Sequence, residues 1–375
     1  MSASRKTISI IVPAFNEEKV ISACLESLLK QKFPKEKFEI IIVDNNSEDK
    51  TAEIIRQYPV KYVFEKRRNR SSARNAGIKA AQGELIAFTD ADCIADPDWL
   101  GELVGKYYSG VNVAGVSGNI RVYDPKTRIE KYFNLIFSNL SRTLFSRRFL
   151  FPGIGTANAL ISLDALTGAG LFDEELDAGE DMDIAMRVCL NGYKFKYAPE
   201  AIVHHRYPSD IRGLIKRSFY AGKGLSLQIK KYRFIGALKP VIQLEKFIKP
   251  KVYGSSRIDV NAYSIVRKFA YFAGYAYGWS INIGDKKKPF IHTDYPSIDW
   301  RYIETDEILV HNSKNNSSYL LNRLGSEIWE LFAEGKDKRE IIEIISAKYQ
   351  DPGNRILTDT HEYIDMLIKE GLLDT

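Results

Sequence analysis

Cysteine is scarce in this chain: Cys24, Cys93 and Cys189 are the only ones among 375 residues, and no two have the CxxC spacing. Cysteines so far apart predict neither a disulfide framework nor a cysteine-based zinc site, and they suit a reducing compartment. No run of about eighteen apolar residues occurs, so the sequence predicts no membrane-spanning helix. The first residues, MSASRK, lack the apolar centre of a signal peptide, so we expect a cytoplasmic location.

The composition that remains is typical of a globular protein. Apolar residues make up 45% of the chain and charged residues 27%, with 21 Tyr, 19 Phe and a formal net charge of +6. This balance excludes an intrinsically disordered chain. The length allows two domains, or one large domain with an appendage.

Strand and helix patterns alternate over the first 90 residues. Apolar, β-branched runs at 7–12, 38–43 and 85–88 predict strands buried on both faces, and a shorter run lies at 60–64. Helical periodicity fills the segments between them. This order requires right-handed crossovers, and it predicts an α/β fold with a mostly parallel central sheet.

Two carboxylates, Asp90 and Asp92, follow the fourth of these strands with one residue between them. Ligands of open α/β sheets bind outside the carboxyl ends of the strands, and alternate residues of an extended segment point the same way. Both side chains can therefore reach one divalent cation. Asp44 ends the second strand at the same edge of the sheet, where it can accept a hydrogen bond from a base or ribose.

A strongly basic loop precedes the third predicted helix. Residues 65–75 contain four arginines and one lysine. Basic side chains beside a helix N-terminus suit phosphate, although such a run taken alone equally fits a solvated loop. Opposite a carboxylate pair, we favour a nucleoside diphosphate bound between the basic loop and a cation at Asp92.

Four motifs in this order resemble the family 2 glycosyltransferases of the GT-A fold: IIVPAFNEE at 10–18, IVDNNS at 42–47, ARNAG at 73–77 and FTDAD at 88–92. The resemblance covers roughly residues 5–225. It implies a nucleotide-sugar donor, with a UDP-sugar favoured, the cofactor Mg²⁺ or Mn²⁺, and inversion at the anomeric carbon. It assigns the cation to Asp92 and the nucleotide sugar to Pro13, Ala14, Asn16, Glu17, Asp44, Arg74 and Asp90.

A second acidic motif, AGEDMDIAMR at 178–187, resembles the family's acceptor-side Glu-Asp motif at the start of a helix. The resemblance makes Asp181 the general base, with Glu180 and Asp183 in support. The chemistry needs such a base, because an acceptor hydroxyl is a poor nucleophile until a carboxylate takes its proton. The alternative is that these acids only stabilise the first turn of a helix.

Two more residues are assigned by the same resemblance. A predicted strand ends in His204 and His205, and His205 matches better a family histidine that lies near the diphosphate and the metal. The alternative is a surface histidine pair. Asn158, at the end of GIGTAN (153–158), resembles the loop that lines the acceptor side.

The middle of the chain is basic and rich in aromatic residues. Residues 206–251 contain twelve Lys or Arg and two acids, and the aromatic stretch 263–279 carries only two charges. These segments predict amphipathic helices. We expect either peripheral contact of residues 206–280 with the inner membrane surface or a helical subdomain with a solvated basic face. No nucleic-acid-binding motif accompanies the charge, so we expect no nucleic acid partner.

The tail has the pattern of a separate small domain. Two short strands at 308–312 and 318–322 precede helices at 325–332, 338–349 and 359–370. YLLNRLGSEIW at 319–329 and EGLL at 370–373 resemble the PqqD-like domains. That resemblance implies a winged-helix-like α+β unit which binds the leader of a precursor peptide by strand addition. The alternative is a packing or dimerisation module.

The sequence thus predicts three regions: a GT-A catalytic domain at 1–225, a basic and aromatic helical extension and linker at 226–297, and a PqqD-like domain at 298–375. The linker is predicted at Lys286–Pro289. We expect a metal-dependent glycosyltransferase whose acceptor is a hydroxyl of a ribosomally made peptide. Two alternatives stay open. The acceptor is a lipid-linked or cell-surface glycan, or the chain is a non-catalytic protein that binds nucleotide sugar or peptide.

Overall fold

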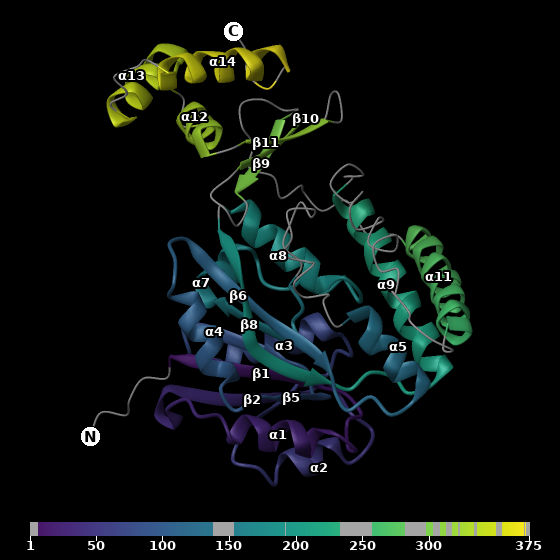
Figure 1. The fold of residues 1–375 in the computed structure, drawn as a ribbon. Helices are drawn as coiled ribbons and strands as arrows, with labels where there is room; N and C mark the ends of the chain where they lie inside the picture. Colours follow the sequence, from purple (N-terminus) through teal and green to yellow (C-terminus); the bar gives the residue numbers. More distant parts are fainter. Residues whose placement is uncertain are drawn as a thin grey trace. The chain divides into compact units, whose positions relative to one another are not determined.

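The computed structural model describes residues 7–137, 154–191, 193–232, 257–281, 298–302, 308–312, 317–321, 323–333, 336–349, 355–370 and 372. The chain forms two compact units (Figure 1). The first consists of Met1–Val188 and Phe195–Lys287, and the second of Cys189–Lys194 and Lys288–Thr375.

Half of the main sheet is the parallel arrangement that the sequence predicts. Strands β1 (Ile8–Ala14), β2 (Phe38–Asp44), β3 (Lys61–Phe64) and β4 (Leu85–Thr89) lie in the order β3-β2-β1-β4 and pair in parallel. They alternate with α1 (Ile21–Leu29), α2 (Thr51–Ile55) and α3 (Arg70–Ala80), and the short 3-10 helix η1 (Lys35–Lys37) precedes β2. The carboxyl ends of β1, β2 and β4 therefore share one edge of the sheet.

The other half makes the sheet mixed rather than mostly parallel. Strands β7 (Asn158–Ser162), β6 (Val113–Val122), β8 (Lys194–His205) and β5 (Cys93–Ala95) extend the order from β4, and the pairs β4–β7, β7–β6 and β8–β5 are antiparallel. Helices α4 (Trp99–Tyr107), α7 (Leu163–Gly168) and α8 (Glu180–Leu190) connect these strands. The β5–β8 pair sets Cys93 opposite His205, directly after Asp92.

The core of the first unit lies between the sheet and its helices. Ile10, Val12, Leu25, Ile42 and Trp99 are among its fully buried side chains. At Gly77 of α3 an added Cβ would lie 2.5 Å from Ile11 Cγ2, so the glycine lets the helix approach β1 closely. This close packing fixes the first residues of α3, which face the candidate site.

Three helices form a separate layer. They are α5 (Arg128–Phe137), α9 (Ile211–Tyr232) and α11 (Arg257–Ser280). The two long helices α9 and α11 pack against each other, as Figure 1 shows. An added Cβ at Gly222 would lie 1.9 Å from Tyr271 O, and one at Gly274 would lie 1.8 Å from Phe219 O. The two backbones therefore meet at their glycines. Within the described residues, no helix is both long and apolar enough to cross a bilayer.

The second unit has a core of its own. Strands β9 (Ile298–Tyr302), β10 (Ile308–Asn312) and β11 (Ser317–Leu321) form an antiparallel sheet in the order β11-β10-β9, followed by α12 (Arg323–Ala333), α13 (Lys338–Tyr349) and α14 (Arg355–Lys369). Trp329, Ile341 and Leu367 are buried in it. The predicted α+β unit is confirmed, with β9 as an additional strand.

The predicted domain limits stay predictions. Residue 225 falls inside α9, so the structure has no break at that position. The segment Lys286–Pro289, taken as a linker in the sequence, lies outside the described residues.

Candidate active site

The loops that follow β1 and β2 are bound to each other. Ser47 Oγ accepts from Asn16 N at 3.0 Å, Asn16 Oδ1 accepts from Glu48 N at 2.8 Å, and Thr51 Oγ1 accepts from Glu17 N at 2.7 Å. Asn16 has φ 57°, in the left-handed region that Asn tolerates. These hydrogen bonds join the PAFNEE loop to the DNNS loop. Within the first loop, Pro13 is half-buried and Ala14 is buried.

Asp44 is buried at the end of β2 and already accepts from two protein donors. Tyr62 Oη donates to Oδ2 at 3.0 Å, and Ser47 N donates to Oδ1 at 3.1 Å. Burial and the neighbouring Asp44 raise the pKa of Tyr62, which therefore stays a neutral donor. Each carboxylate oxygen keeps a second lone pair, so Asp44 can still accept from a ligand.

Arg74 joins the two acidic motifs. Its Nη1 lies 2.8 Å from Glu180 Oε1 and its Nη2 lies 3.3 Å from Asp90 Oδ1. The arginine is only 2% exposed, and it sits one turn into α3, whose first amides are capped by Asn69. Burial alone would raise the pKa of Asp90, but the charge of Arg74 holds it below its usual range.

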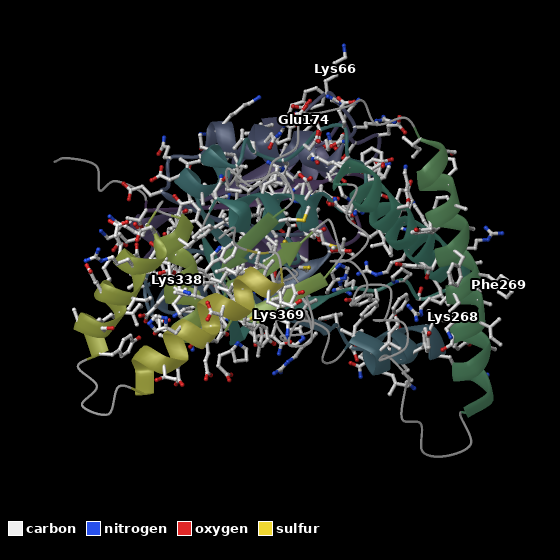
Figure 2. The ribbon with its side chains drawn as sticks, turned by 90° about the horizontal axis from the view of Figure 1, so that it is seen from above. Lys66, Glu174, Lys268, Phe269, Lys338 and Lys369 are labelled. Atoms are coloured by element: carbon white, nitrogen blue, oxygen red, sulfur yellow. The ribbon has the colours of Figure 1, made fainter. Side chains whose placement is uncertain are left out.

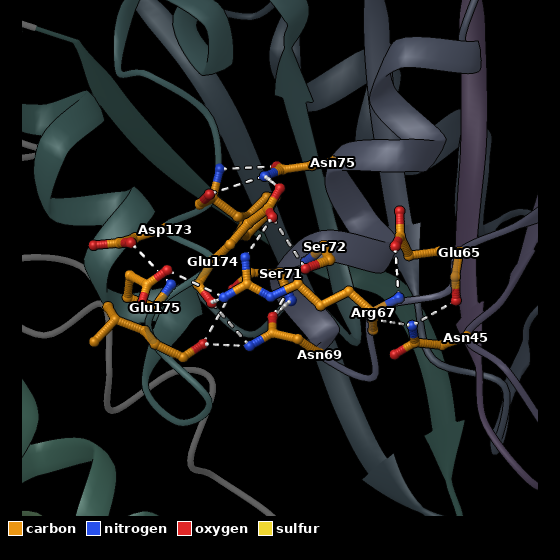
Figure 3. Close-up of polar contacts among 12 residues, drawn as sticks. Asn45, Glu65, Arg67, Asn69, Ser71, Ser72, Asn75, Asp173, Glu174 and Glu175 are labelled. Atoms are coloured by element: carbon orange, nitrogen blue, oxygen red, sulfur yellow. Dashed lines mark hydrogen bonds and ion pairs between the residues drawn. The ribbon is translucent and has the colours of Figure 1, made fainter. Parts of the chain in front are cut away.

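The basic loop before α3 binds an acidic loop of the protein itself. Arg67 Nη1 lies 3.2 Å from Glu174 Oε2 and its Nη2 lies 3.1 Å from Glu175 Oε1, as Figure 3 shows. Asn75 Nδ2 donates to Phe172 O and to Glu174 Oε1, both at 2.9 Å. Arg67 therefore connects its loop to the segment before α8. Arg70 is exposed, and its charge adds to the lowering of the pKa of Asp90 and partly opposes the rise in the pKa of Glu17.

Asp181 lies in the first turn of α8, where Met182 N donates to its Oδ1 at 2.8 Å. Burial, then the negative charge of Glu180, raise its pKa to about 6, and Arg74 opposes them. A carboxylate with this pKa is mostly ionised at neutral pH and is basic enough to take a proton from a hydroxyl.

The other two acids of this motif are engaged in ion pairs. Glu180 is buried against Arg74. Asp183 is fully buried, and Arg187 Nε donates to its Oδ2 at 2.9 Å. Lys231 of α9 contacts Asp183 as well and lies 2.8 Å from Asp173. Asp183 therefore fixes α8 in place and is not aimed at an acceptor.

Asp92, Cys93 and His205 form a candidate metal-binding group, since one potential ligand atom from each lies within 4.8 Å of the others. His205 Nδ1 lies 3.0 Å from Arg206 O, so Nδ1–H donates to that carbonyl and Nε2 is the unprotonated nitrogen. Burial lowers the pKa of His205, which agrees with a neutral ring.

A divalent cation fits between these residues. Nε2 of His205 lies 3.6 Å from Asp92 Oδ1, too far for a hydrogen bond, and both atoms are acceptors. The carboxylate oxygen of Asp92 suits Mg²⁺ or Mn²⁺, whereas an imidazole nitrogen favours a softer first-row ion, so the pair suits Mn²⁺ better than Mg²⁺. Burial raises the pKa of the Cys93 thiol, which makes it a poor ligand.

Glu17 shares this acidic environment. Burial, then the charges of Asp92 and Asp90, raise its pKa to about 7. Glu17 therefore belongs to the electrostatic neighbourhood of the Asp-x-Asp motif, as its assignment to the donor site requires.

Asn158 is fully buried and its amide is used by the fold. Trp99 Nε1 donates to its Oδ1 at 2.8 Å, and its Nδ2 donates to Asn119 O at 3.0 Å and Ala201 O at 2.8 Å. This fully buried side chain joins β7 to its neighbours, so the structure gives it a role in the fold.

Two residues near the metal-binding group were missed by the sequence analysis. The ring centroid of Tyr207 lies 4.6 Å from that of His205. The guanidinium carbon of Arg217, in α9, lies 4.6 Å from the ring centroid of Tyr207. Arg217 also lowers the pKa of His205. Only the general basic character of the segment pointed to Arg217, because its contact depends on the turn between β8 and α9.

Comparison with known proteins agrees with this arrangement. Residues 9–167 match the family model described as Glycosyl transferase family 2. The glycosyltransferase AglE of Haloferax volcanii is 31% identical over 233 residues, which cover 60% of this chain and 74% of that protein. The chain belongs to family 2 of the glycosyltransferases. The predicted enzyme class, acting on nucleotide-sugar donors, is confirmed, and the non-catalytic alternative is left without support.

Two further proteins are similar to large parts of this glycosyltransferase. A transferase of Methanococcus voltae, named for a dolichyl N-acetyl-α-D-glucosaminyl phosphate acceptor, is 28% identical over 241 residues, 60% of this chain and 75% of that protein. The mannosyltransferase PcManGT of Pyrobaculum calidifontis, solved with GDP-Man and Mn²⁺, has a TM-score of 0.50 and 22% identity, covering 72% of this chain and 76% of that one. This likeness supports the GT-A fold.

The tail has its own match. Residues 307–373 match the family model described as Coenzyme PQQ synthesis protein D (PqqD). The predicted PqqD-like domain is therefore confirmed.

Proposed function

We propose that this chain is a metal-dependent, inverting glycosyltransferase in which Asp181 is the general base. The observation that carries the proposal is the Arg74 bridge, which joins donor-side Asp90 to Glu180, the residue before Asp181. An acceptor hydroxyl bound beside Asp181 loses its proton to this carboxylate as its oxygen attacks the anomeric carbon. The bond to the nucleoside diphosphate breaks on the opposite face, which inverts the anomeric centre.

Asp92 and His205 are the proposed cation ligands. Carboxylate and imidazole leave further coordination positions for oxygens of the donor diphosphate, as Mg²⁺ and Mn²⁺ sites require. The cation, when bound, offsets negative charge on the leaving diphosphate. The PcManGT structure, which was solved with GDP-Man and Mn²⁺, supports a cation beside the donor.

The hydrogen-bonded loops that follow β1 and β2 are the proposed nucleotide site. In this proposal Pro13, Ala14, Asn16 and Glu17 line the nucleotide, and Asp44 accepts from its base or ribose. Arg74 acts through Asp90, because both of its terminal nitrogens are occupied by carboxylates. A UDP-sugar is the favoured donor.

A thermal-shift titration tests the donor part of this proposal. UDP and GDP, each with Mn²⁺ or with EDTA, are added to the full chain, since a ligand that binds the native state raises its melting temperature. We expect a rise with one diphosphate that requires Mn²⁺. No shift with either nucleotide, or equal shifts in EDTA, would contradict a metal-dependent donor site.

For the acceptor we propose a ribosomally made peptide bound by the PqqD-like domain. The sheet of the second unit ends in β9 on one side and β11 on the other, and an extended peptide can add a strand to such an edge. Fluorescence anisotropy with labelled peptides encoded beside the gene tests this idea on the full chain. The absence of binding by all of them would oppose a peptide acceptor.

A lipid-linked glycan is the second candidate acceptor. It is favoured by the name of the Methanococcus voltae relative, a transferase that acts on a dolichyl-linked sugar phosphate. It would require action at a membrane surface, with the protein peripheral on the cytoplasmic side. Transfer of a labelled sugar to a polyprenyl-phosphate-linked sugar, with no transfer to peptide, would favour this candidate.

A further inference from the structure

The outer side of α11 carries apolar side chains where a solvated helix carries polar ones. Ile265, Phe269 and Phe272 are 55%, 73% and 62% exposed. Their i, i+4, i+7 spacing sets them on one face of the helix. We call these three residues the α11 stripe. Lys268 lies beside it, and Figure 2 shows Phe269 at the outer edge of the helix.

Two other faces of α11 pack against α9 and α5. Gly274 and Gly278 meet α9 at very short range. On the side facing α5, Arg267 Nε donates to Tyr132 Oη at 3.2 Å, and that hydroxyl lies 3.1 Å from Ser264 Oγ. Among the described residues, the stripe is therefore the face of α11 that does not pack against α9 or α5.

Positive charge accompanies the stripe. Of the nine Lys or Arg in α9 and α11, Lys223, Lys231 and Arg267 are used in contacts within the first unit, and Lys268 is exposed beside the stripe. Arg212 and Lys216 are exposed on α9, next to the partly exposed apolar residues Ile211 and Ile215. Exposed apolar patches mark interaction sites, and a basic rim selects an anionic partner.

We propose that the outer face of the α9–α11 pair docks on an anionic lipid bilayer. The α11 stripe enters the boundary between headgroups and acyl chains, while Arg212, Lys216 and Lys268 lie among the lipid phosphates. Aromatic and aliphatic residues on one face with basic residues beside them are the combination that holds a helix in a membrane interface. The docking does not depend on which acceptor the enzyme uses.

This surface lies on the same helices that reach the candidate active site. Arg217 of α9 stacks on Tyr207, beside His205, and Gln228 Nε2 donates to Gly179 O at 2.9 Å, next to Glu180. A docked α9–α11 pair therefore holds both halves of the site close to the membrane surface.

Vesicle flotation tests the proposal on the full chain. Phosphatidylcholine vesicles are compared with vesicles containing about 30% phosphatidylglycerol, at low and high salt, because charge-assisted docking weakens as ions screen it. We expect the wild type to float with the anionic vesicles, and to float less at high salt. The double variant Phe269→Glu/Phe272→Glu should bind at least about tenfold more weakly.

Two further variants sharpen this experiment. Arg212→Glu/Lys216→Glu should lose most of the preference for anionic lipid while keeping a folded chain. Val111→Glu is the matched control, since Val111 is 85% exposed in the loop between α4 and β6, and it should float like the wild type. Melting temperature and nucleotide-diphosphate binding of each variant show that the fold and the donor site are intact, independently of lipid binding.

Three outcomes would overturn the docking. The first is a wild type that does not bind anionic vesicles. The second is a Phe269→Glu/Phe272→Glu variant that floats as well as the wild type. The third is a wild type that is a dimer without lipid while this double variant is a monomer. The last result would assign the stripe to a second copy of the chain. A protein that docks but transfers no sugar would contradict the proposed reaction and leave the docking intact.

Discussion

Arg74 and Glu180 are 106 residues apart in the chain, and their side chains meet at 2.8 Å between Nη1 and Oε1. The pair is buried, and the second guanidinium nitrogen reaches Asp90. Through this one arginine the strand end that carries the Asp-x-Asp motif is joined to the helix start that carries Asp181. The proposed donor and acceptor halves of the site are therefore joined by the same buried charge.

Arg74→Met should destabilise the fold by about 3–5 kcal/mol, because it leaves Glu180 buried without its partner. The double variant Arg74→Met/Glu180→Gln should regain part of this loss, since no unpaired charge is left at Glu180. Urea unfolding followed by circular dichroism measures both. Arg68→Met is the control: Arg68 forms an exposed pair with Glu48, and its loss should cost under about 1 kcal/mol.

The rate of transfer should fall on the acid side with an apparent pKa of about 6, the pKa to which burial and Glu180 raise Asp181. A base works only when ionised, so the rate at pH 5 should be about one tenth of the plateau. Glu180→Gln removes the neighbouring negative charge and should move this limb to lower pH. A limb that stays in place, or moves upward, would contradict Asp181 as the group that titrates.

Asp92→Asn and His205→Ala should each weaken Mn²⁺-dependent binding of a nucleoside diphosphate by at least about tenfold, since loss of even an outer-shell partner costs this much in metal sites. Isothermal titration calorimetry with and without Mn²⁺ measures the effect. His204→Ala is a matched control, because His204 lies 3.1 Å from Asp96 and belongs to no metal-binding group among the described residues. Equal losses in His204→Ala and His205→Ala would remove His205 as a ligand.

Asn158→Ala should destabilise the protein by about 3 kcal/mol or more, because it leaves Trp99 Nε1 and two buried carbonyls without partners. Urea unfolding again provides the measurement. Asn134→Ala, on the exposed side of α5, makes the same substitution without a buried partner and should change stability little. A stable Asn158→Ala variant with impaired acceptor use would restore Asn158 to the acceptor side.

Local pattern was sufficient to predict the parallel half of the sheet and the helices of the tail. The apolar runs of β1, β2 and β4 and the periodicity of α13 are contained within single segments. Of the antiparallel half, the sequence predicts the end of β8 at His204 and His205, but not β5, because β5 has only three residues and forms by pairing with β8 about one hundred residues later. No sequence window contains both partners of such a pair.

The candidate site shows the same division. The motifs that carry Asp90, Asp92 and Asp181 could be found in the sequence because each is short and contiguous. Their connections could not, since the partners of Arg74 and Arg67 depend on how distant loops meet. The basic segment 65–75 therefore predicts a nucleotide partner for both arginines, whereas the structure pairs them with the protein's own carboxylates.

The central claim is that Asp181 takes the acceptor proton in a site whose donor half binds independently. Asp181→Asn keeps the size of the side chain and removes the base. Calorimetric titration with the preferred nucleoside diphosphate and Mn²⁺ should give a dissociation constant within about twofold of wild type, while sugar transfer falls by about 10²–10⁴-fold. Turnover that survives in Asp181→Asn at the wild-type rate would contradict the account.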